Sequence, residues 1–361
     1  MGATGGDEEY DQLLTHAFVD RLGFDSVSTL LPVSVPSLYL YAATFVFLDF
    51  GLVNTYFHVF TGRSHGFTRN PFSLAIPAAV LVAAAGVRYM TLNYRRAIDQ
   101  MNLRERSDRA AYPTDTGFTV SLRTRATVYV LVLGAYYAYI LGVIGLPSYI
   151  ETFGVVPTAA FAGVIYPLGY VPIAVDFVTQ FASIQFVLPV RIARVRPTPA
   201  FLDPRNLGGF YPIGELFKRT YYIYTVGLLL YLCYVYGPGL TGLGTAAVSR
   251  AGTPEAGFFT LLWAFGLVAV GSSMFTVHRL MASEKKSHLS QLEQQLHDIV
   301  TNPYDISSAE LHNNPEVEQI QRRIEQVRAM REYPASINTS MQLLASLLAP
   351  EIINLLLNSI S

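Results

Sequence analysis

The chain has 361 residues, of which 51% are hydrophobic and only 14% are charged. A soluble domain carries roughly 25% charged residues, and here the charges gather in short segments between long uncharged runs. This pattern excludes a soluble enzyme with one central core, and the continuous apolar runs exclude an alternating outer-membrane barrel. We therefore expect an all-α, polytopic membrane protein.

Charge and motifs narrow the functional classes further. The formal net charge is −1, so no global field attracts nucleic acid, and a single cysteine excludes an intrachain disulfide. The sequence contains no H-E-x-x-H, P-loop, G-x-S-x-G or zinc spacing. We therefore expect no enzymatic activity, no metal ion and no cofactor.

Residues 1–35 form the N-terminal segment, and they lack the basic and apolar regions of a cleavable signal peptide. Between residues 7 and 22, Leu14, Ala17, Phe18 and Leu22 follow helical spacing. This pattern predicts a short amphipathic helix that lies against the inner membrane face or against the protein itself.

Apolar windows long enough to cross a bilayer predict seven transmembrane helices, because about 20 apolar residues span the hydrocarbon core. The windows are 37–60, 72–94, 126–146, 157–190, 221–236, 258–278 and 336–359. The fourth is too long for one perpendicular crossing, so it should tilt, project beyond the inner face, or break at Pro167, Pro172 or Pro189. Residues 36–278 then form a six-span bundle.

The placement of Lys and Arg predicts the orientation of the spans. Segments 95–125, 191–219 and 279–331 hold 20 of the 25 basic residues, and with seven spans they share one side with the N-terminus. We therefore expect a cytoplasmic N-terminus and an outside C-terminus. This orientation excludes G-protein-coupled receptors, and the three lysines all fall in cytoplasmic segments, which excludes a retinal Schiff base.

Three ionisable residues fall inside the expected spans: Asp49 in the first, Arg88 in the second and Asp176 in the fourth. A central charge costs about 2.5–3.5 kcal/mol on insertion scales, so it normally faces the bundle and finds a partner. We expect Arg88 to pair with Asp49, with Asp176 or with both. The interaction would be a structural ion pair or part of an ion or proton path.

Two cytoplasmic segments have predictable local structure. Loop 191–219 is rich in Pro and Gly, which favours a structured hinge over a phosphate-binding loop. Residues 279–335 contain two apolar stripes at helical spacing separated by Asn302-Pro303 and Asn314-Pro315, which predicts a helical hairpin. Its stripes would pack against other subunits as an oligomer anchor or against the inner ends of the spans; the anchor residues are Leu289, Leu292, Leu296, Ile320, Ile324 and Val327.

The C-terminal segment, residues 336–361, is the most polar of the expected spans. Two stripes at helical spacing lie on either side of Pro350. Their members are Asn338, Gln342, Ser346, Glu351, Asn354 and Asn358. Because lipid offers such groups no partners, they should line a pore or hydrogen-bond to neighbouring helices.

The layout of seven spans, a cytoplasmic N-terminus, a cytoplasmic helical segment and a polar last span resembles the seven-transmembrane ion channels typified by insect odorant and gustatory receptors. The resemblance implies a tetramer held by a cytoplasmic anchor, with the last helix lining a cation pore. The aromatic-rich signature of the insect proteins is absent, because residues 336–350 contain no aromatic side chain.

From these observations we expect a homo-oligomeric, tetrameric cation channel in the plasma membrane. Its partners would be other copies of itself, the lipid bilayer and permeant ions, with a small-molecule ligand left open. Two alternatives remain: a secondary or proton-coupled transporter that uses Asp49, Arg88 and Asp176, and a membrane signalling or scaffold protein.

Overall fold

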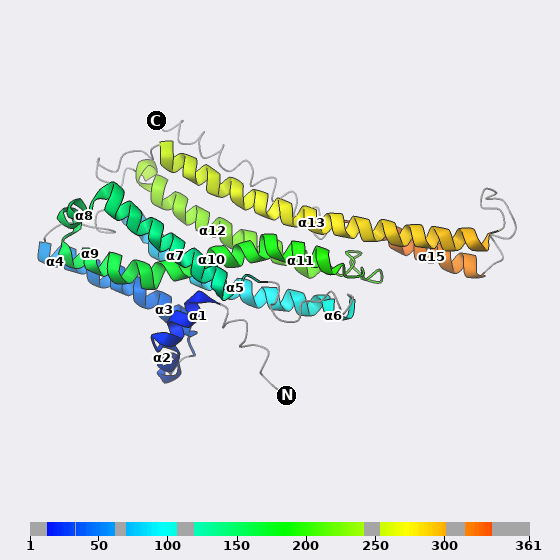
Figure 1. Cartoon of the computed structure of the whole chain (residues 1–361), viewed down its shortest axis with the longest axis horizontal. Helices are drawn as coiled ribbons and strands as arrows, with labels where there is room; N and C mark the ends of the chain where they lie inside the picture. The colour runs from blue at the N-terminus through cyan, green and yellow to red at the C-terminus, as the bar shows by residue number, and fades with distance from the viewer. Residues whose placement is uncertain are drawn as a thin grey trace.

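The structure is a computed structural model that describes residues 13–32, 34–61, 70–106, 119–241, 253–300 and 315–333. These residues form helices and no strand (Figure 1), which confirms the all-α expectation. The elements, in chain order, are α1 (Leu14–Arg21), α2 (Phe24–Leu30), α3 (Ser37–Val46), η1 (Phe47–Val53), α4 (Asn54–Thr61), η3 (Pro71–Leu74), α5 (Ala75–Met101), α6 (Leu103–Arg106), α7 (Leu122–Tyr139), η4 (Ile140–Ile144), α8 (Leu146–Phe153), α9 (Val155–Ala160), η5 (Phe161–Tyr170), α10 (Val171–Ala182), η6 (Ser183–Val187), α11 (Leu188–Val195), α12 (Tyr211–Thr241), α13 (Thr253–Ile299) and α15 (Pro315–Ala329).

Five helices are long and apolar enough to cross a membrane, so the chain has the character of a multi-pass membrane protein. They correspond to the first four predicted spans and to the sixth. Their bounds are Ser37–Phe60, Pro71–Met101, Leu122–Gly142, Val155–Val195 and Thr260–Ile299. The fifth window lies within α12, a 31-residue helix that packs mainly between α5 and α13. The seventh window lies outside the described residues.

The fourth helix, Val155–Val195, continues through Pro167, Pro172 and Pro189, so of the three expected alternatives a break at a proline does not occur. Its 41 residues reach about 60 Å at 1.5 Å per residue, which is roughly twice the hydrocarbon thickness. Pro167 lies inside the π-helical segment η5, Pro172 is the second residue after that segment, and Pro189 is the second residue after η6. Proline has no N–H and crowds the carbonyl of the preceding turn, and the wider π-helical turns accommodate it. The helix therefore changes direction at these places and does not end.

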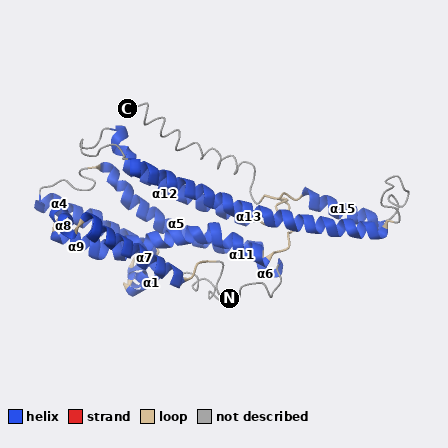
Figure 2. Ribbon diagram, turned by 45° about the horizontal axis from the view of Figure 1, so that its top comes forward, coloured by secondary structure: helices blue, strands red, loops and turns tan. Residues whose placement is uncertain are grey.

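The helix α13 joins the bundle to a projecting hairpin. It has 47 residues, or about 70 Å of length, and runs without interruption from the expected sixth span into the segment predicted as a separate hairpin helix. α15 packs along its far end (Figure 2). The predicted hairpin is thus present, but its first helix is the continuation of a bundle helix.

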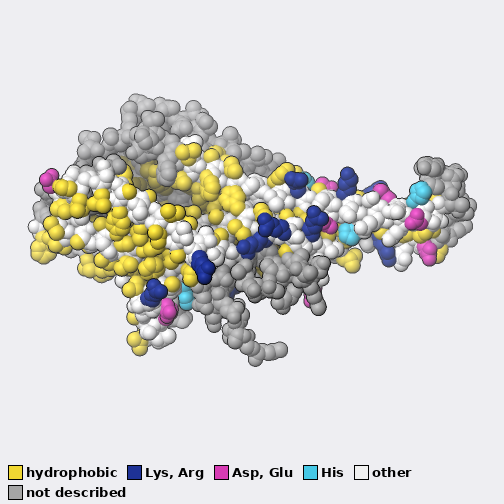
Figure 3. Space-filling view, viewed as in Figure 1, with side chains coloured by type: hydrophobic (Ala, Val, Ile, Leu, Met, Phe, Trp, Pro, Cys, Tyr) yellow, Lys and Arg dark blue, Asp and Glu magenta, His cyan; other side chains and the backbone are white. Residues whose placement is uncertain are grey.

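The surface differs along the length of the molecule. Figure 3 shows hydrophobic side chains over much of the bundle, a group of Lys and Arg side chains near the middle, and mixed charges along the projection. Large apolar side chains such as Phe47, Leu131 and Val268 are more than 60% exposed on the bundle. A lipid environment accounts for this exposure, because water would not tolerate such a continuous apolar surface.

Candidate functional site

The N-terminal helix α1 is fixed to the bundle by the carboxylate of Asp176. Leu13, the residue before the helix, has no side chain that caps it. Instead, the backbone N–H groups of Leu14 and Thr15 donate to Asp176 Oδ1 at 3.1 Å and Oδ2 at 2.6 Å. The Thr15 hydroxyl also donates to Oδ2, at 2.6 Å. Asp176, in the middle of the fourth helix, therefore supplies the missing N-terminal cap of α1. Its negative charge also interacts favourably with the positive end of the α1 helix dipole.

On its other side, Asp176 is paired with Arg125 in the first turn of α7. Nη1 of Arg125 lies 3.1 Å from Asp176 Oδ1, and the two side chains are 1% and 0% exposed. The same guanidinium donates to Thr179 Oγ1 and Gln180 Oε1, each at 2.7 Å. Because positions i, i+3 and i+4 share one helix face, a single planar guanidinium bonds to three side chains of α10.

Arg88 is not the partner of either carboxylate, so the structure corrects the predicted pairing. Its guanidinium carbon lies 5.5 Å from the centroid of the Tyr39 ring, in a cation–π contact between α5 and α3. Because the expected third span begins at residue 126, the sequence predicts that Arg125 lies in the cytoplasmic segment 95–125. α7 actually begins at Leu122 and carries Arg125 into the bundle.

Asp49 has a different and neutral partner. Its side chain is 4% exposed, and its Oδ2 accepts a hydrogen bond from the Tyr170 hydroxyl at 2.5 Å. The two residues lie in the π-helical turns η1 and η5, so this contact joins the first and fourth helices. Neither Asp49 nor Asp176 forms an ion pair with Arg88, so the three residues do not form one polar path.

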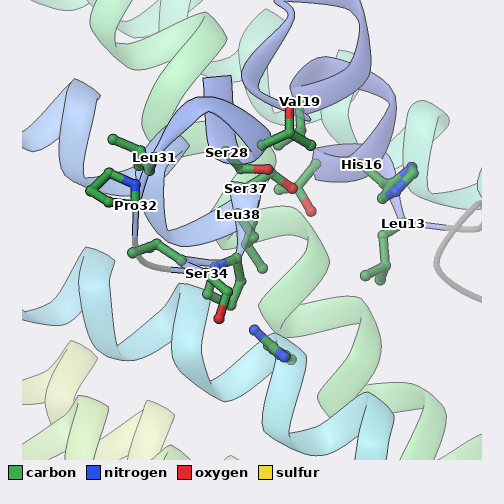
Figure 4. Close-up of a pocket in the computed structure, with 14 residues that line it drawn as sticks. Leu13, His16, Val19, Ser28, Leu31, Pro32, Ser34, Ser37 and Leu38 are labelled. Carbon is green, nitrogen blue, oxygen red and sulfur yellow. The ribbon is translucent and has the colours of Figure 1, made fainter. Parts of the chain in front are cut away.

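A cavity of about 920 Å³ opens beside α1. Its lining comes from α1, α2, the segment after α2 and the start of α3 (Figure 4), with Arg88 contributed by α5. The labelled residues include His16, Ser28, Ser34 and Ser37 among apolar neighbours. This mixture of one cation, hydroxyls and apolar surface is suited to a small amphipathic ligand.

Gln185 makes further polar contacts inside the bundle, and its partners could not be assigned from the sequence. Gln185, fully buried in η6, donates through Nε2 to the Phe217 carbonyl at 3.1 Å. Its Oε1 accepts from Ser273 Oγ at 2.7 Å. This one side chain therefore links the fourth helix to both α12 and α13. The available signal was an amide side chain in a long apolar run, which needs a partner when lipid surrounds it.

Loop 196–210 is held together by Asp203 and Arg106. Burial of the Asp203 carboxyl favours its neutral form, but the backbone N–H groups of Arg205, Gly209 and Leu207 donate to it and lower its pKa below the usual value. Arg106 donates to the carbonyls of Thr198 at 2.9 Å and Gly208 at 2.7 Å. Burial lowers the pKa of Arg106, and the charge of Asp203 opposes that change. The loop is therefore ordered by hydrogen bonds within it and from Arg106 of α6, and its role as a hinge stays a prediction.

The same loop anchors the root of the projecting hairpin. The backbone N–H of Arg331 donates to the Asn206 carbonyl at 2.7 Å. Lys285 of α13 donates to the Met330 and Arg328 carbonyls at 2.7 and 3.1 Å, so it caps the C-terminal end of α15. The His278 and Tyr333 rings stack with centroids 4.0 Å apart. Contacts thus join the three basic segments 95–125, 191–219 and 279–331 at one end of the bundle.

Half of the predicted oligomer anchor is buried within one subunit. On α15, Ile320, Ile324 and Val327 are at most 7% exposed, and α15 packs on α13. On α13, Leu289, Leu292 and Leu296 are only half-buried. The α15 stripe therefore packs within the chain and needs no second subunit to cover it, whereas anchoring through the leucine stripe of α13 stays a prediction.

The predicted pore-lining residues all lie outside the described residues. They are Asn338, Gln342, Ser346, Glu351, Asn354 and Asn358. Their role stays a prediction from the sequence.

A search of family models, curated proteins and solved structures finds no match to the chain. Its function must therefore be inferred from the sequence and from the geometry given above. The resemblance to seven-transmembrane ion channels stays an expectation from the sequence.

Proposed function

We propose that the chain forms a homo-oligomeric cation channel of the plasma membrane, with four subunits as the expected assembly. The N-terminus would be cytoplasmic, and the C-terminal helix within residues 336–361 would cross the membrane as the seventh span and line the pore. The observation that carries the proposal is the contrast between this segment, with six polar side chains in two stripes, and the carboxylates of the described bundle, which are engaged in structural contacts.

The contacts of Asp49 and Asp176 support this assignment over a transporter. A carboxylate on a transport path must exchange partners during each cycle. Asp176 instead accepts from the backbone of α1, from the Thr15 hydroxyl and from Arg125, all within a site that excludes solvent. Releasing it would unfasten the N-terminal helix. The permeation path is therefore better sought in the C-terminal segment.

The projecting hairpin, formed by the far end of α13 and by α15, supports the proposal that several copies of the chain assemble. It extends away from the bundle along α13 and is rooted by the contacts of Lys285 and Arg331. Leu289, Leu292 and Leu296 of α13 are only half-buried although α15 packs on this helix, so the projection keeps some apolar surface. In water such a stripe is stabilised when a neighbouring copy covers it.

Reconstitution tests the proposal directly. Purified protein in lipid nanodiscs should have a mass of several copies, with four expected, and planar bilayers should show unitary cation currents. Leu292→Asp should reduce the assembly to smaller species, whereas the control Gln294→Asp, on an exposed position of the same helix, should leave it intact. A protein that stays monomeric and shows counterflow without unitary currents would contradict the channel and favour a transporter.

Orientation needs its own experiment. After replacement of the native Cys233, a cysteine at Ser287 of α13 should react with an impermeant thiol reagent only after cells are permeabilised. A cysteine at Ala247, between α12 and α13, should react in intact cells. The reverse pattern would overturn the orientation inferred from the basic segments.

A further inference from the structure

A polar pocket of about 340 Å³ lies where α5, α12 and loop 196–210 meet. It is separate from the cavity beside α1, and the channel proposal does not use it. The residues on which the argument depends are Asn93 and Arg96 of α5, Arg205 of the loop, and Tyr211, Glu215 and Arg219 of α12.

The pocket carries an excess of positive charge. Three guanidinium groups and one carboxylate line it, which leaves a net positive charge even though that carboxylate, Glu215, pairs with both the Lys218 ammonium and the Arg219 guanidinium, whose Nε lies 3.6 Å from Oε2. Two of the arginines are held in place: Nη1 of Arg219 donates to Asn93 Oδ1 at 3.2 Å, and Arg205 lies 3.8 Å from the centroid of the Tyr211 ring. Each guanidinium has five N–H donors, so these contacts orient the groups without using all their donors.

The pocket lies at the boundary between apolar and polar sequence on both of its helices. On α12 the apolar run that begins at Tyr221 starts two residues after Arg219. On α5 the antiparallel apolar stretch gives way to Arg95 and Arg96. In a bilayer this level is that of the lipid phosphates. The first turn of α12 also lines the pocket through Tyr211 and Pro212, and the positive end of a helix dipole favours an anion.

We propose that this pocket binds the phosphate group of an anionic phospholipid, with Arg96, Arg205 and Arg219 as its ligands. Guanidinium groups match the oxygens of a phosphate in geometry and charge. Basic pockets between transmembrane helices are suited to acidic headgroups. A free phosphate offers the same oxygens, but the position of the pocket at the end of two apolar helices favours the lipid. A bound headgroup would join α5, α12 and the loop that roots the hairpin.

Native mass spectrometry of detergent-purified protein doped with phosphatidylglycerol or phosphatidylcholine tests the inference. The wild type should retain phosphatidylglycerol preferentially, and Arg96→Gln/Arg219→Gln should weaken that retention about tenfold. The matched control Arg123→Gln/Arg194→Gln removes two exposed arginines that do not line the pocket. It should bind as the wild type does. Arg96→Gln alone should weaken binding less than the double variant does.

Each outcome decides between the lipid, a soluble anion and no site. Equal loss in the pocket variant and the control would show only general electrostatic attraction and overturn the inference. Displacement of phosphatidylglycerol by millimolar inorganic phosphate would assign the pocket to a soluble anion and contradict the lipid. Because the readout is binding, the inference stands or fails independently of ion conduction.

Discussion

The bundle and the projecting hairpin use polar side chains in opposite ways. In the bundle, Arg125 and Asp176 are almost fully buried and their bonds link three elements, α1, α7 and α10. In the hairpin, the pairs Arg322–Glu318 and Arg328–Glu293 span 3.4 and 3.9 Å with every side chain more than half exposed. Such exposed pairs contribute little, so the hairpin must be held by the apolar stripe of α15.

The difference follows from the solvent of each region. Lipid tails are as apolar as leucine, so apolar contacts between helices gain little in a bilayer, and specific polar bonds and close packing must fix the bundle. Water drives apolar surface together, so a single stripe suffices to hold α15 on α13. Removing a buried polar partner should therefore destabilise the bundle most, whereas removing a buried apolar side chain should destabilise the hairpin most.

The largest effect is expected at the buried cluster. Arg125→Leu leaves Asp176 without its countercharge, and breaking a buried ion pair costs about 3–5 kcal/mol. We expect a strongly lowered melting temperature in detergent and poor expression, with partial rescue by Asp176→Asn, because the amide oxygen still accepts from α1. Arg88→Leu is the matched control and should cost much less, since it removes only the contact with Tyr39. Equal damage from both changes would contradict the assigned pairing.

The next largest effect is expected in the apolar stripe of the hairpin. Ile324 is 7% exposed, and truncating such a residue to alanine typically costs about 2–5 kcal/mol. Ile324→Ala should therefore speed hydrogen exchange throughout α15 and leave the melting of the bundle unchanged. Gln321→Ala, on the exposed face, should leave exchange as it is. Loss of bundle stability with Ile324→Ala would mean that the two regions are not independent.

A smaller and pH-dependent effect is expected at Asp203. Asp203→Asn weakens charge-assisted hydrogen bonds from three backbone N–H groups, and we expect a cost of about 1–2 kcal/mol. Because the folded pKa lies below the ordinary value of 3.8, the advantage of the wild type should be complete at neutral pH. It should disappear as the pH falls through that lowered pKa. Limited proteolysis of loop 196–210 in the wild type and in Asp203→Asn measures this advantage as a function of pH. A difference between the two proteins that grows on acidification would refute the assignment.

The smallest effect is expected for the surface ion pairs. Glu318→Ala removes the partner of Arg322 at the i,i+4 spacing, where such pairs contribute about 0.2–0.5 kcal/mol. Hydrogen exchange in α15 should change barely above error, and 0.5 M salt should remove the difference. A loss comparable to that of Ile324→Ala would mean that charges, and not the apolar stripe, hold the hairpin.

The sequence predicted those features that depend on one helix at a time. Apolar length located the helices, and the spacing of Val317, Ile320, Ile324 and Val327 identified the buried face of α15. Prolines at 167, 172 and 189 marked the places where the fourth helix changes its turn, although they do not end it. These properties are local, so periodicity and backbone chemistry are sufficient to predict them.

The contacts between helices were beyond the same reasoning. Arg125 is the fourth residue of α7, whose first turn contains two arginines and a threonine, so the charge pattern predicted a loop at this position. Asp176 caps α1 by bonding to two residues that precede it in the sequence by 162 and 161 positions. No periodicity in the sequence specifies such a long-range contact. Tyr170 acquires its partner only when the first and fourth helices pack together, and Gln185 acquires its partners only when the fourth helix packs against α12 and α13.

The channel proposal requires that residues 336–361 line a cation pore, and Glu351 tests this requirement most directly. We expect reversal potentials across a salt gradient in planar bilayers to show reduced cation preference for Glu351→Gln, most clearly at low ionic strength, where screening of the carboxylate is weak. A thermal melt of the same preparation should match that of the wild type. Unchanged permeation together with a lowered melting temperature would place Glu351 in a helix–helix interface and contradict the channel.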